Sequence, residues 1–509
     1  MSVNQLKAGV ILSYISQGLQ ILITVFYTPV MLHLMGQSEY GIYQLAFSTV
    51  SLLSLMTFGF SSSYVKFFAK ASLQEEKDKY IADLNGTFVT VFTVLACVVL
   101  LIGLWLAYDT EHLLGGKLTM DELKTAKVVM YILVVNCALH FIYVVPSNYI
   151  IANERFVVSQ ILGLIRIVMN PCITFPLIYI GYGSISLSIG LLTITIINLL
   201  LAIYYSLRKL RMHFAFDNLQ WSLFKDIGIF SFWIFLESLI TMLNHNVDRI
   251  LLGKYVGTVG LTIYTVGYSI VTLYTTMSLS ISSVFSPRIN QMVEQGNCRQ
   301  QLSNLFIRVG RIQFLVLFLF LLGFGIFGQR FFFIWVGPGY NMSYLITMIL
   351  ITVGTIDLIQ SLAYIIQRAM DMQKYRDYLW LGVAIGKVAL SIFLIQIWGI
   401  LGAAVASAIA TLIGQGVLMN WFYATKIHLD IKTFWKEISR MSLGGVIPLV
   451  VGILVHRQLA DCSLLLYFTY IAAFAVVYCL SMYVFGFNST DRLEVRKYVL
   501  SLPIVRRKH

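Results

Sequence analysis

The chain has 509 residues, of which 58% are hydrophobic and 12% are charged. Soluble globular proteins are about 45–50% apolar and about 25% charged, so this composition excludes a water-soluble fold. The net charge of +13 could indicate nucleic-acid binding, but no basic segment carries the interleaved aromatic residues that stack on bases. We therefore expect a membrane protein with no nucleic-acid partner.

Apolar stretches of about 20 residues follow one another along the chain. A helix of this length crosses a bilayer, and lipid offers its backbone no other hydrogen-bond partner. The sequence therefore predicts an all-α, polytopic membrane protein with about 14 transmembrane helices. The predicted spans are 8–32, 41–65, 86–108, 128–151, 157–180, 185–207, 226–248, 259–286, 305–329, 343–366, 377–397, 400–424, 441–456 and 463–487.

The lysines and arginines are unevenly divided among the segments that connect these spans. If the N-terminus is cytoplasmic, 25 of them lie in cytoplasmic segments and 7 in outer segments. Cytoplasmic segments of membrane proteins are enriched in these residues, so both termini are expected in the cytoplasm. Most of the positive charge then orients a multi-pass protein in its membrane.

An internal repeat appears when the chain is shifted by 221 residues. Nine identities over 27 positions result, and Gly36 and Tyr43 fall on Gly257 and Tyr264. The shift predicts two related six-helix halves with two appended helices, a plan typical of transporters that bind substrate between the halves. The predicted parts are an N-terminal half at 1–207, a C-terminal half at 208–424, appended helices at 425–487 and a basic cytoplasmic tail at 488–509.

Four ionisable residues lie deep within predicted spans: Arg166, Glu237, Asp357 and Lys387. A charge at the bilayer centre costs roughly 2.5–3.5 kcal/mol on insertion scales, so each needs a partner, a wet cavity or a function. Arg166 and Lys387 coincide under the 221-residue shift. They either line the cleft and attract an anionic substrate, or each pairs with a buried carboxylate. Glu237 and Asp357 either bind a coupling proton or sodium ion, or act as counter-ions.

The most polar run within any span is at the outer end of the seventh. Asn244 and His245 are candidate substrate-binding residues there, and Asp248 and Arg249 are candidate gate residues. The alternative is an ordinary helix terminus with interfacial charges. His33 and His140, near other span ends, are expected to be interfacial or satisfied histidines and not ligands.

No motif for catalysis or metal binding is present in the sequence. It has no phosphate-binding loop, no HExxH, no GxSxG and no acidic cluster with metal-ligand spacing. We expect no enzyme activity, no metal and no cofactor, apart from possible coupling to a Na+ or H+ gradient.

Three segments resemble one family of transporters. The segment from Thr28 to Ala69, TPVMLHLMGQSEYGIYQLAFSTVSLLSLMTFGFSSSYVKFFA, resembles the first two helices of the polysaccharide-export branch of the multidrug/oligosaccharidyl-lipid/polysaccharide flippase superfamily. Val247 to Ile270 is similar to that branch's junction of spans 7 and 8, and Trp398 to Gln415 to its twelfth helix. Together these segments resemble Wzx-type flippases.

This resemblance implies a flippase that moves lipid-linked oligosaccharide repeat units, with undecaprenyl diphosphate as the lipid carrier, across the cytoplasmic membrane by alternating access. The product would supply O-antigen, capsule or exopolysaccharide synthesis. The expected partners are the lipid-linked oligosaccharide, membrane lipids, and the polysaccharide polymerase and glycosyltransferases of the same pathway. The alternative is a cation-coupled multidrug or toxin exporter of the same superfamily, which Glu237 and Asp357 would suit.

The sequence departs from some lipid flippases of this superfamily, which have several arginines in the first, second and eighth spans. Only Lys66 lies in those spans here, so Arg166 and Lys387 would be the holders of a diphosphate. Gly36 and Gly257, at equivalent positions of the repeat, would let helices or loops approach closely and shift during transport. Static close packing is the alternative for both.

Overall fold

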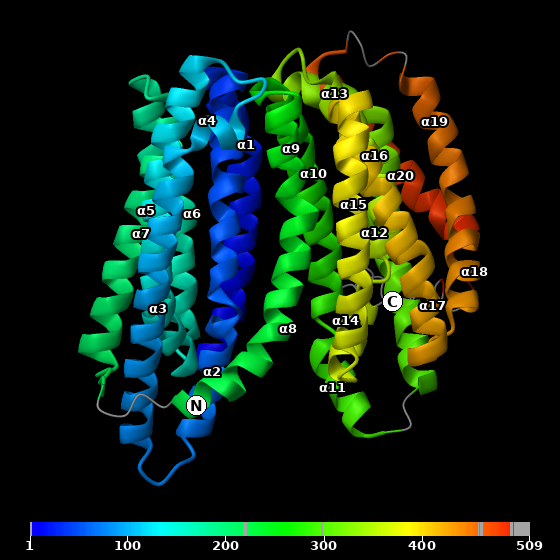
Figure 1. Cartoon of the computed structure of the whole chain (residues 1–509). Helices are drawn as coiled ribbons and strands as arrows, with labels where there is room; N and C mark the ends of the chain where they lie inside the picture. The colour runs from blue at the N-terminus through cyan, green and yellow to red at the C-terminus, as the bar shows by residue number, and fades with distance from the viewer. Residues whose placement is uncertain are drawn as a thin grey trace. The chain divides into compact units, whose positions relative to one another are not determined.

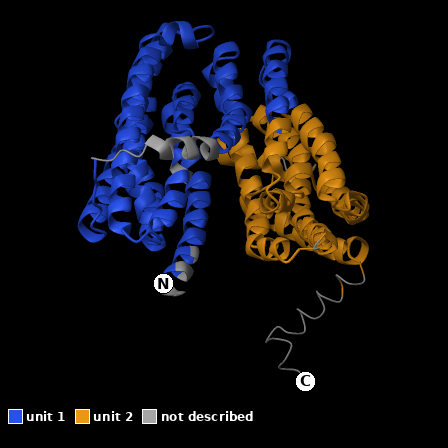
Figure 2. Ribbon diagram, turned by 60° about the horizontal axis from the view of Figure 1, so that its bottom comes forward, with its two compact units in different colours: residues 1–266, 380–406 blue, residues 267–379, 407–509 orange. Residues whose placement is uncertain are grey.

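The computed structural model describes residues 3–216, 221–296, 299–456, 458, 462–488 and 492 (Figure 1). These residues form helices and connecting turns, and none of them forms a strand. The chain divides into two compact units, residues 1–266 with 380–406 and residues 267–379 with 407–509 (Figure 2).

The first unit is built mainly from the N-terminal helices. Its elements are α1 (Val3–Ser51), η1 (Leu52–Thr57), α2 (Phe60–Ala71), α3 (Lys77–Tyr108), α4 (Thr110–Leu114), α5 (Met120–Ala152), α6 (Phe156–Tyr179), α7 (Gly183–Tyr204), η2 (Tyr205–Lys209), α8 (Trp221–His245) and α9 (Val247–Tyr255). The chain crosses between the units within three further helices, α10 (Thr258–Ser283), α15 (Gln373–Trp398) and α16 (Ile400–Thr411).

The second unit holds the remaining elements. They are α11 (Ser286–Glu294), α12 (Arg299–Val336), α13 (Asn341–Leu358), α14 (Leu362–Ala369), η3 (Leu412–Met419), α17 (Asn420–Phe422), η4 (Tyr423–Ile427), α18 (Ile431–Ser442), η5 (Leu443–Gly445), α19 (Val446–His456), α20 (Leu464–Ser481) and η6 (Met482–Gly486).

Long apolar helices account for most of both units, as the sequence predicts. Among the described residues, eleven helical segments are long and apolar enough to cross a membrane. The first, Ile11–Thr57, covers parts of two predicted spans, because α1 continues past a break at Gly36 where φ is 80° and ψ is 170°. The all-α, polytopic membrane fold is confirmed.

Other parts of the prediction have no test in this structure. The total of fourteen spans and the cytoplasmic location of the termini stay predictions, as does the division into halves at 207 and 424. The predicted basic tail, 488–509, lies outside the described residues except for Asn488 and Arg492.

The core of the first unit lies around α5. This helix packs against α1, α3 and α7, while α6 packs against α1 and α7. Side chains such as Met130 and Ile150 on α5 are wholly buried, and the rings of Phe92 on α3 and Phe141 on α5 lie 6.3 Å apart. A rigid bundle of these helices supports the polar groups described below.

In the second unit α12 is the central helix and packs against α13, α18, α19 and α20. Ile326, Phe327, Tyr467 and Phe474 form a buried cluster there. Gly452 of α19 lies directly against Ile326, where a Cβ would clash. Small residues allow this close helix contact, which is a common way of packing helices inside membranes.

Candidate functional site

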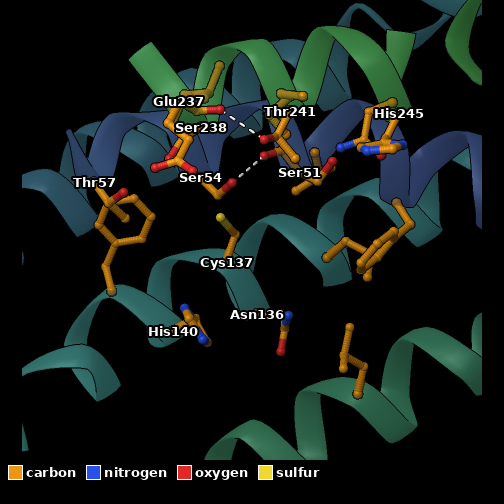
Figure 3. Close-up of a pocket in the computed structure, with 18 of the residues that line it drawn as sticks. Ser51, Ser54, Thr57, Asn136, Cys137, His140, Glu237, Ser238, Thr241 and His245 are labelled. Atoms are coloured by element: carbon orange, nitrogen blue, oxygen red, sulfur yellow. Dashed lines mark hydrogen bonds between the residues drawn. The ribbon is translucent and has the colours of Figure 1, made fainter. Parts of the chain in front are cut away.

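A polar cavity of about 650 Å³ lies inside the first unit, between α1, η1, α5, α6, α7 and α8. Ten of the side chains around it are labelled in Figure 3. The lining residues are Phe47, Val50, Ser51, Ser54, Leu55, Thr57, Leu133, Asn136, Cys137, His140, Phe141, Arg166, Leu191, Glu237, Ser238, Thr241, Met242, His245 and Asn246. Its volume is typical of small-molecule binding sites, which are about 300–1,000 Å³.

One wall of the cavity comes from a break in the second predicted span. α1 ends at Ser51 and continues as the short 3₁₀ helix η1, after which Phe58 and Gly59 take left-handed conformations with φ of 46° and 72°. The hydroxyl of Ser54 donates to the carbonyl of Ser51 at 2.6 Å (Figure 3). Irregular backbone at membrane depth is tolerated where it lines a cavity, so this break supplies polar groups to the site.

The cavity brings together three of the predicted site residues, Arg166, Glu237 and His245. Arg166 comes from α6, and the other two come from α8. In the described part of the chain, the exposed Arg166 guanidinium makes no hydrogen bond or ion pair. A guanidinium that faces a wet cavity can bind a phosphate through paired hydrogen bonds.

A second wall of the cavity comes from α5, and the sequence prediction missed it. Asn136, Cys137 and His140 all line the cavity from this helix (Figure 3). His140, which the sequence predicts to be interfacial or satisfied and not a ligand, lies on the cavity side of α5, and that prediction stays untested. The spacing of Asn136 and His140, four residues apart on one helix face, was the signal that could have indicated a shared polar surface.

Asn136 also has an unmet hydrogen-bonding capacity. Its buried Oδ1 atom has no hydrogen-bond partner among the described residues. Buried polar atoms are nearly always paired, so an orphaned acceptor on a cavity wall is suited to a hydroxyl group of a ligand or to a water molecule.

Lys387, the other predicted cation, lies elsewhere in the first unit. Its Nζ atom is 2.7 Å from Asp248 Oδ2, and the two side chains are 4% and 1% exposed. Lys387 also donates to the carbonyl of Asn244, and Ser391 donates to Asp248 Oδ1 at 3.0 Å. The sequence left two alternatives for Lys387, a substrate contact or a pair with a buried carboxylate. In this structure Lys387 forms a pair with the buried carboxylate of Asp248.

The short interruption between α8 and α9 places the partners of Lys387. α8 ends at His245 and α9 begins at Val247, so the Asn244 carbonyl and the Asp248 side chain lie on either side of the break. Lys387 approaches both from α15. The predicted polar run therefore has two roles: His245 and Asn246 line the cavity, while Asn244 and Asp248 hold Lys387.

Asp357, the second predicted coupling residue, belongs to the second unit and is not among the cavity's lining residues. It accepts a hydrogen bond from Tyr364, whose ring lies 4.2 Å below the Arg376 guanidinium. Gln415 Nε2 continues the polar network to Gln360 Oε1 at 3.1 Å. This network surrounds the turn between α13 and α14.

The candidate gate glycines both have backbones that require glycine. Gly36 has φ of 80° and Gly257 has φ of 101°, in the left-handed region that other residues adopt only with strain. The two sit at equivalent positions of the 221-residue repeat, and a positive φ recurs at both. Their predicted role as gate elements stays a prediction.

A carboxylate that the sequence prediction missed joins the two repeated loops. Glu122, near the start of α5, accepts hydrogen bonds from Ser38, two residues after Gly36, and from Thr258, directly after Gly257, at 2.7 Å for the latter. It also caps α5 through Thr119. Glu122 therefore ties both loops to one helix end. Arg249, the other candidate gate residue, lies on α9, nine residues before Thr258.

Among the described residues, no group of three or more His, Cys, Asp or Glu side chains has an arrangement that could hold a metal ion. The chemistry available in the cavity is therefore hydrogen bonding by hydroxyl, amide and imidazole groups, with one guanidinium and one carboxyl group.

A family described as "Polysaccharide biosynthesis protein" matches residues 6–293, more than half of the chain. This chain belongs to the polysaccharide biosynthesis protein family. The match includes every helix that lines the cavity, so the polar site lies within the part of the chain that defines the family.

Relatives of this polysaccharide biosynthesis protein extend over most of its length. A protein of Shigella flexneri named "Putative O-antigen transporter" is 18% identical over 396 residues, which is 76% of this chain and 90% of the relative. The solved structure of lipid II flippase MurJ in an inward closed conformation has a TM-score of 0.74, 18% identity, and coverage of 94% of this chain and 98% of its own.

An inward-facing multidrug resistance MATE family transporter of the MOP superfamily is also similar. Its TM-score is 0.64 at 11% identity, with coverage of 83% of this chain and 99% of the transporter. Because the sequence identities are this low, the two solved structures show only that this chain shares their fold.

Proposed function

We propose that the protein is a flippase that translocates lipid-linked oligosaccharide repeat units across the cytoplasmic membrane by alternating access. The observation that carries this proposal is the polar cavity of a membrane-embedded, polysaccharide-family protein, with Arg166 facing into it. The Shigella flexneri relative named "Putative O-antigen transporter" and the fold shared with lipid II flippase MurJ support the same class of substrate.

The lining of the cavity suits the headgroup of such a substrate. Sugar hydroxyls both donate and accept hydrogen bonds, and the side chains of Ser51, Ser54, Asn136 and Thr241 can do the same. These groups replace the water that a sugar loses on leaving the aqueous phase, which removes most of the barrier to its crossing the membrane. A cavity lined by apolar groups alone could not do so.

Arg166 suits the charged end of the substrate. A lipid carrier joined through a diphosphate brings several negative charges close to the bilayer centre, where an unpaired charge is strongly disfavoured. The guanidinium can bind phosphate oxygens in a bidentate geometry. The polyprenyl chain is far too large for a 650 Å³ cavity, so it stays in the surrounding lipid.

Lys387 is not part of this proposal. It pairs with Asp248. Among the described residues that line the cavity, Arg166 is the one arginine or lysine. The proposed partners are membrane lipids and, in the same pathway, a polysaccharide polymerase and glycosyltransferases that use and supply lipid-linked oligosaccharide.

Complementation of a strain lacking the protein's gene tests the role of Arg166. We expect the deletion strain to accumulate lipid-linked oligosaccharide in the cytoplasmic leaflet, and Arg166→Gln to relieve this accumulation about tenfold less well than the wild type, since one charge-assisted phosphate contact is lost. Arg166→Lys, which keeps the charge, should retain part of the activity.

The matched control is Arg155→Gln, which removes an arginine at the start of the same helix but outside the cavity. Equal amounts of each variant in the membrane must be verified by immunoblotting. Full complementation by Arg166→Gln would contradict the assignment.

A cation-coupled exporter of drugs or toxins remains the second proposal, because Glu237 lies in the cavity and the MATE family transporter has a similar fold. The flippase proposal is favoured by the family to which the chain belongs. Within the flippase proposal, Glu237 is the candidate for coupling to an H+ or Na+ gradient, because it shares the cavity with the substrate.

A further inference from the structure

A second polar cavity, of about 470 Å³, lies in the second unit between α11 and the first part of α12. The two helices are consecutive in the chain, and the turn that follows α11 includes Gly296, whose φ is 69°. The residues that line this groove are Arg288, Gln291, Met292, Gln295, Gln301, Asn304, Leu305 and Arg308.

The spacing of these residues shows that each helix presents one face to the groove. Positions 288, 291, 292 and 295 follow the order i, i+3, i+4 and i+7, and positions 301, 304, 305 and 308 repeat it. Residues with this spacing share one side of a helix. The groove is therefore built by one face of α11 and one face of α12.

The two arginines lie at the same end of the groove. A helix rises about 1.5 Å per residue, so Arg288 and Arg308 each lie about 10–14 Å along their helix from the turn. Because the chain reverses direction at the turn, the two guanidinium groups reach the same level from opposite walls. In the described part of the chain, the exposed Arg288 makes no hydrogen bond or ion pair.

The chemistry of the lining indicates an anionic ligand. None of the lining residues is acidic, and four of them carry amide side chains that can donate hydrogen bonds. Arginine matches the oxygens of a phosphate through its planar set of donors better than lysine does. Two arginines with neighbouring amides form a site suited to a phosphate group.

The surroundings of the arginines indicate where that phosphate comes from. Val284 is four residues before Arg288 and is 62% exposed, while Ile312 is four residues after Arg308 and is 42% exposed. These exposed apolar side chains, Val284 in the turn before α11 and Ile312 on α12, mark the surface that meets lipid hydrocarbon. Arginines at that boundary lie at the depth of phospholipid headgroups.

We propose that this groove binds the headgroup of an anionic phospholipid, with Arg288 and Arg308 holding its phosphate and the amide side chains contacting the polar part beyond it. The positions of lysines and arginines in the sequence predict that this loop is cytoplasmic, where bilayers are rich in anionic lipid. General positive-inside topology explains basic residues here, but it does not explain their convergence from two helix faces on one amide-lined groove.

Native mass spectrometry of the full-length protein, released from detergent with added phosphatidylglycerol, tests the proposal. Arg288→Gln with Arg308→Gln should bind phosphatidylglycerol about thirtyfold more weakly than the wild type, because each of the two basic residues near a membrane surface contributes about 1 kcal/mol to lipid binding. The matched control is Arg299→Gln with Lys432→Gln, which removes two exposed charges from the same unit outside the groove. The control should bind as the wild type does.

Arg288→Gln alone provides a second variant if the double variant does not fold, because the Arg288 side chain has no structural partner among the described residues. Unchanged phosphatidylglycerol binding in Arg288→Gln and in the folded double variant would overturn the proposal. Inorganic pyrophosphate is the probe for a ligand from solution. Binding of pyrophosphate that depends on the arginines, without any effect on phosphatidylglycerol, would overturn the headgroup assignment.

Discussion

Lys387 and Asp248 form an ion pair that is almost completely removed from solvent. Such a pair does not by itself stabilise a protein much, but the loss of one partner leaves an uncompensated buried charge. Ser391 and the Asn244 carbonyl complete the hydrogen bonds of the two groups. We interpret Lys387 as the residue that fixes α15 to the junction of α8 and α9.

This interpretation predicts different outcomes for single and double substitutions. Lys387→Gln should lower the free energy of unfolding by about 3–5 kcal/mol, because Asp248 would stay buried without a cation. Lys387→Met combined with Asp248→Leu should recover most of that loss. Equilibrium unfolding of the purified variants in detergent measures both. A loss of less than about 1 kcal/mol for Lys387→Gln would contradict a structural role.

Transport by the double variant distinguishes two roles of Lys387, joining helices and contacting the substrate. If the lysine only joins helices, the double variant should keep lipid-linked oligosaccharide transport within a few-fold of the wild type. If transport is abolished in a stable double variant, Lys387 contacts the substrate in another conformation.

Breaks in helices, rather than the helices themselves, place the polar groups of this protein. The break at Gly36 and the turn at Gly257 present Ser38 and Thr258 to Glu122, and the 3₁₀ helix η1, which follows Ser51, places Ser54 on the cavity wall. Each break has at least one residue with positive φ or a short 3₁₀ turn. The functional features of the elements are therefore local irregularities.

Gly36 and Gly257, at equivalent positions of the repeat, allow a direct test of whether these breaks require glycine. Gly36→Ala and Gly257→Ala should each lower the free energy of unfolding by about 1–2 kcal/mol, since alanine is disfavoured at positive φ. No atom lies within 4 Å of the Cβ that Gly36 would gain. The stability lost in Gly36→Ala would therefore report backbone strain alone. Unfolding in detergent gives the measurement.

Gly163 of α6 is the matched control, because a Cβ there also meets no atom within 4 Å and its backbone is helical. Gly163→Ala should leave stability unchanged or raise it, as alanine favours helices. Equal effects at Gly36, Gly257 and Gly163 would show that the positive φ angles carry no strain.

The elements also show how much the sequence could predict. Every predicted span coincides with part of a helix, because a run of apolar residues long enough for a bilayer leaves the backbone no other choice. The interruptions near Phe58, Asn246 and Gln360 lie inside apolar runs, and tertiary contacts determine them. Sequence patterns therefore predicted the helices and missed the breaks.

The candidate site was predictable to a similar degree. Arg166, Glu237 and His245 could be singled out because charged or polar residues are rare in apolar spans, and all three line the cavity. The partner of Lys387 could not be predicted, because it depends on which helices pack together. For the same reason, the contribution of Asn136 and the joining role of Glu122 appeared only in three dimensions.

At the scale of the whole molecule, the location of Glu237 in the cavity gives a testable account of energy coupling. A carboxyl group there could exchange a proton or sodium ion as substrate binds and leaves. Glu237→Gln should abolish the dependence of transport on an ion gradient while gradient-independent movement persists. Asp357→Asn, in the other unit, is the comparison. Transport by Glu237→Gln that still follows an imposed H+ or Na+ gradient would contradict this assignment.

The central claim is that the polar cavity carries lipid-linked oligosaccharides across the membrane. The direct measurement uses purified protein in proteoliposomes with a fluorescent lipid-linked oligosaccharide, whose arrival in the outer leaflet is followed with a membrane-impermeant lectin. We predict that the wild type moves this lipid and that Arg166→Gln does so about tenfold more slowly. Absence of movement by active wild-type protein, together with gradient-driven export of a cationic dye from the same vesicles, would contradict the flippase and support the exporter.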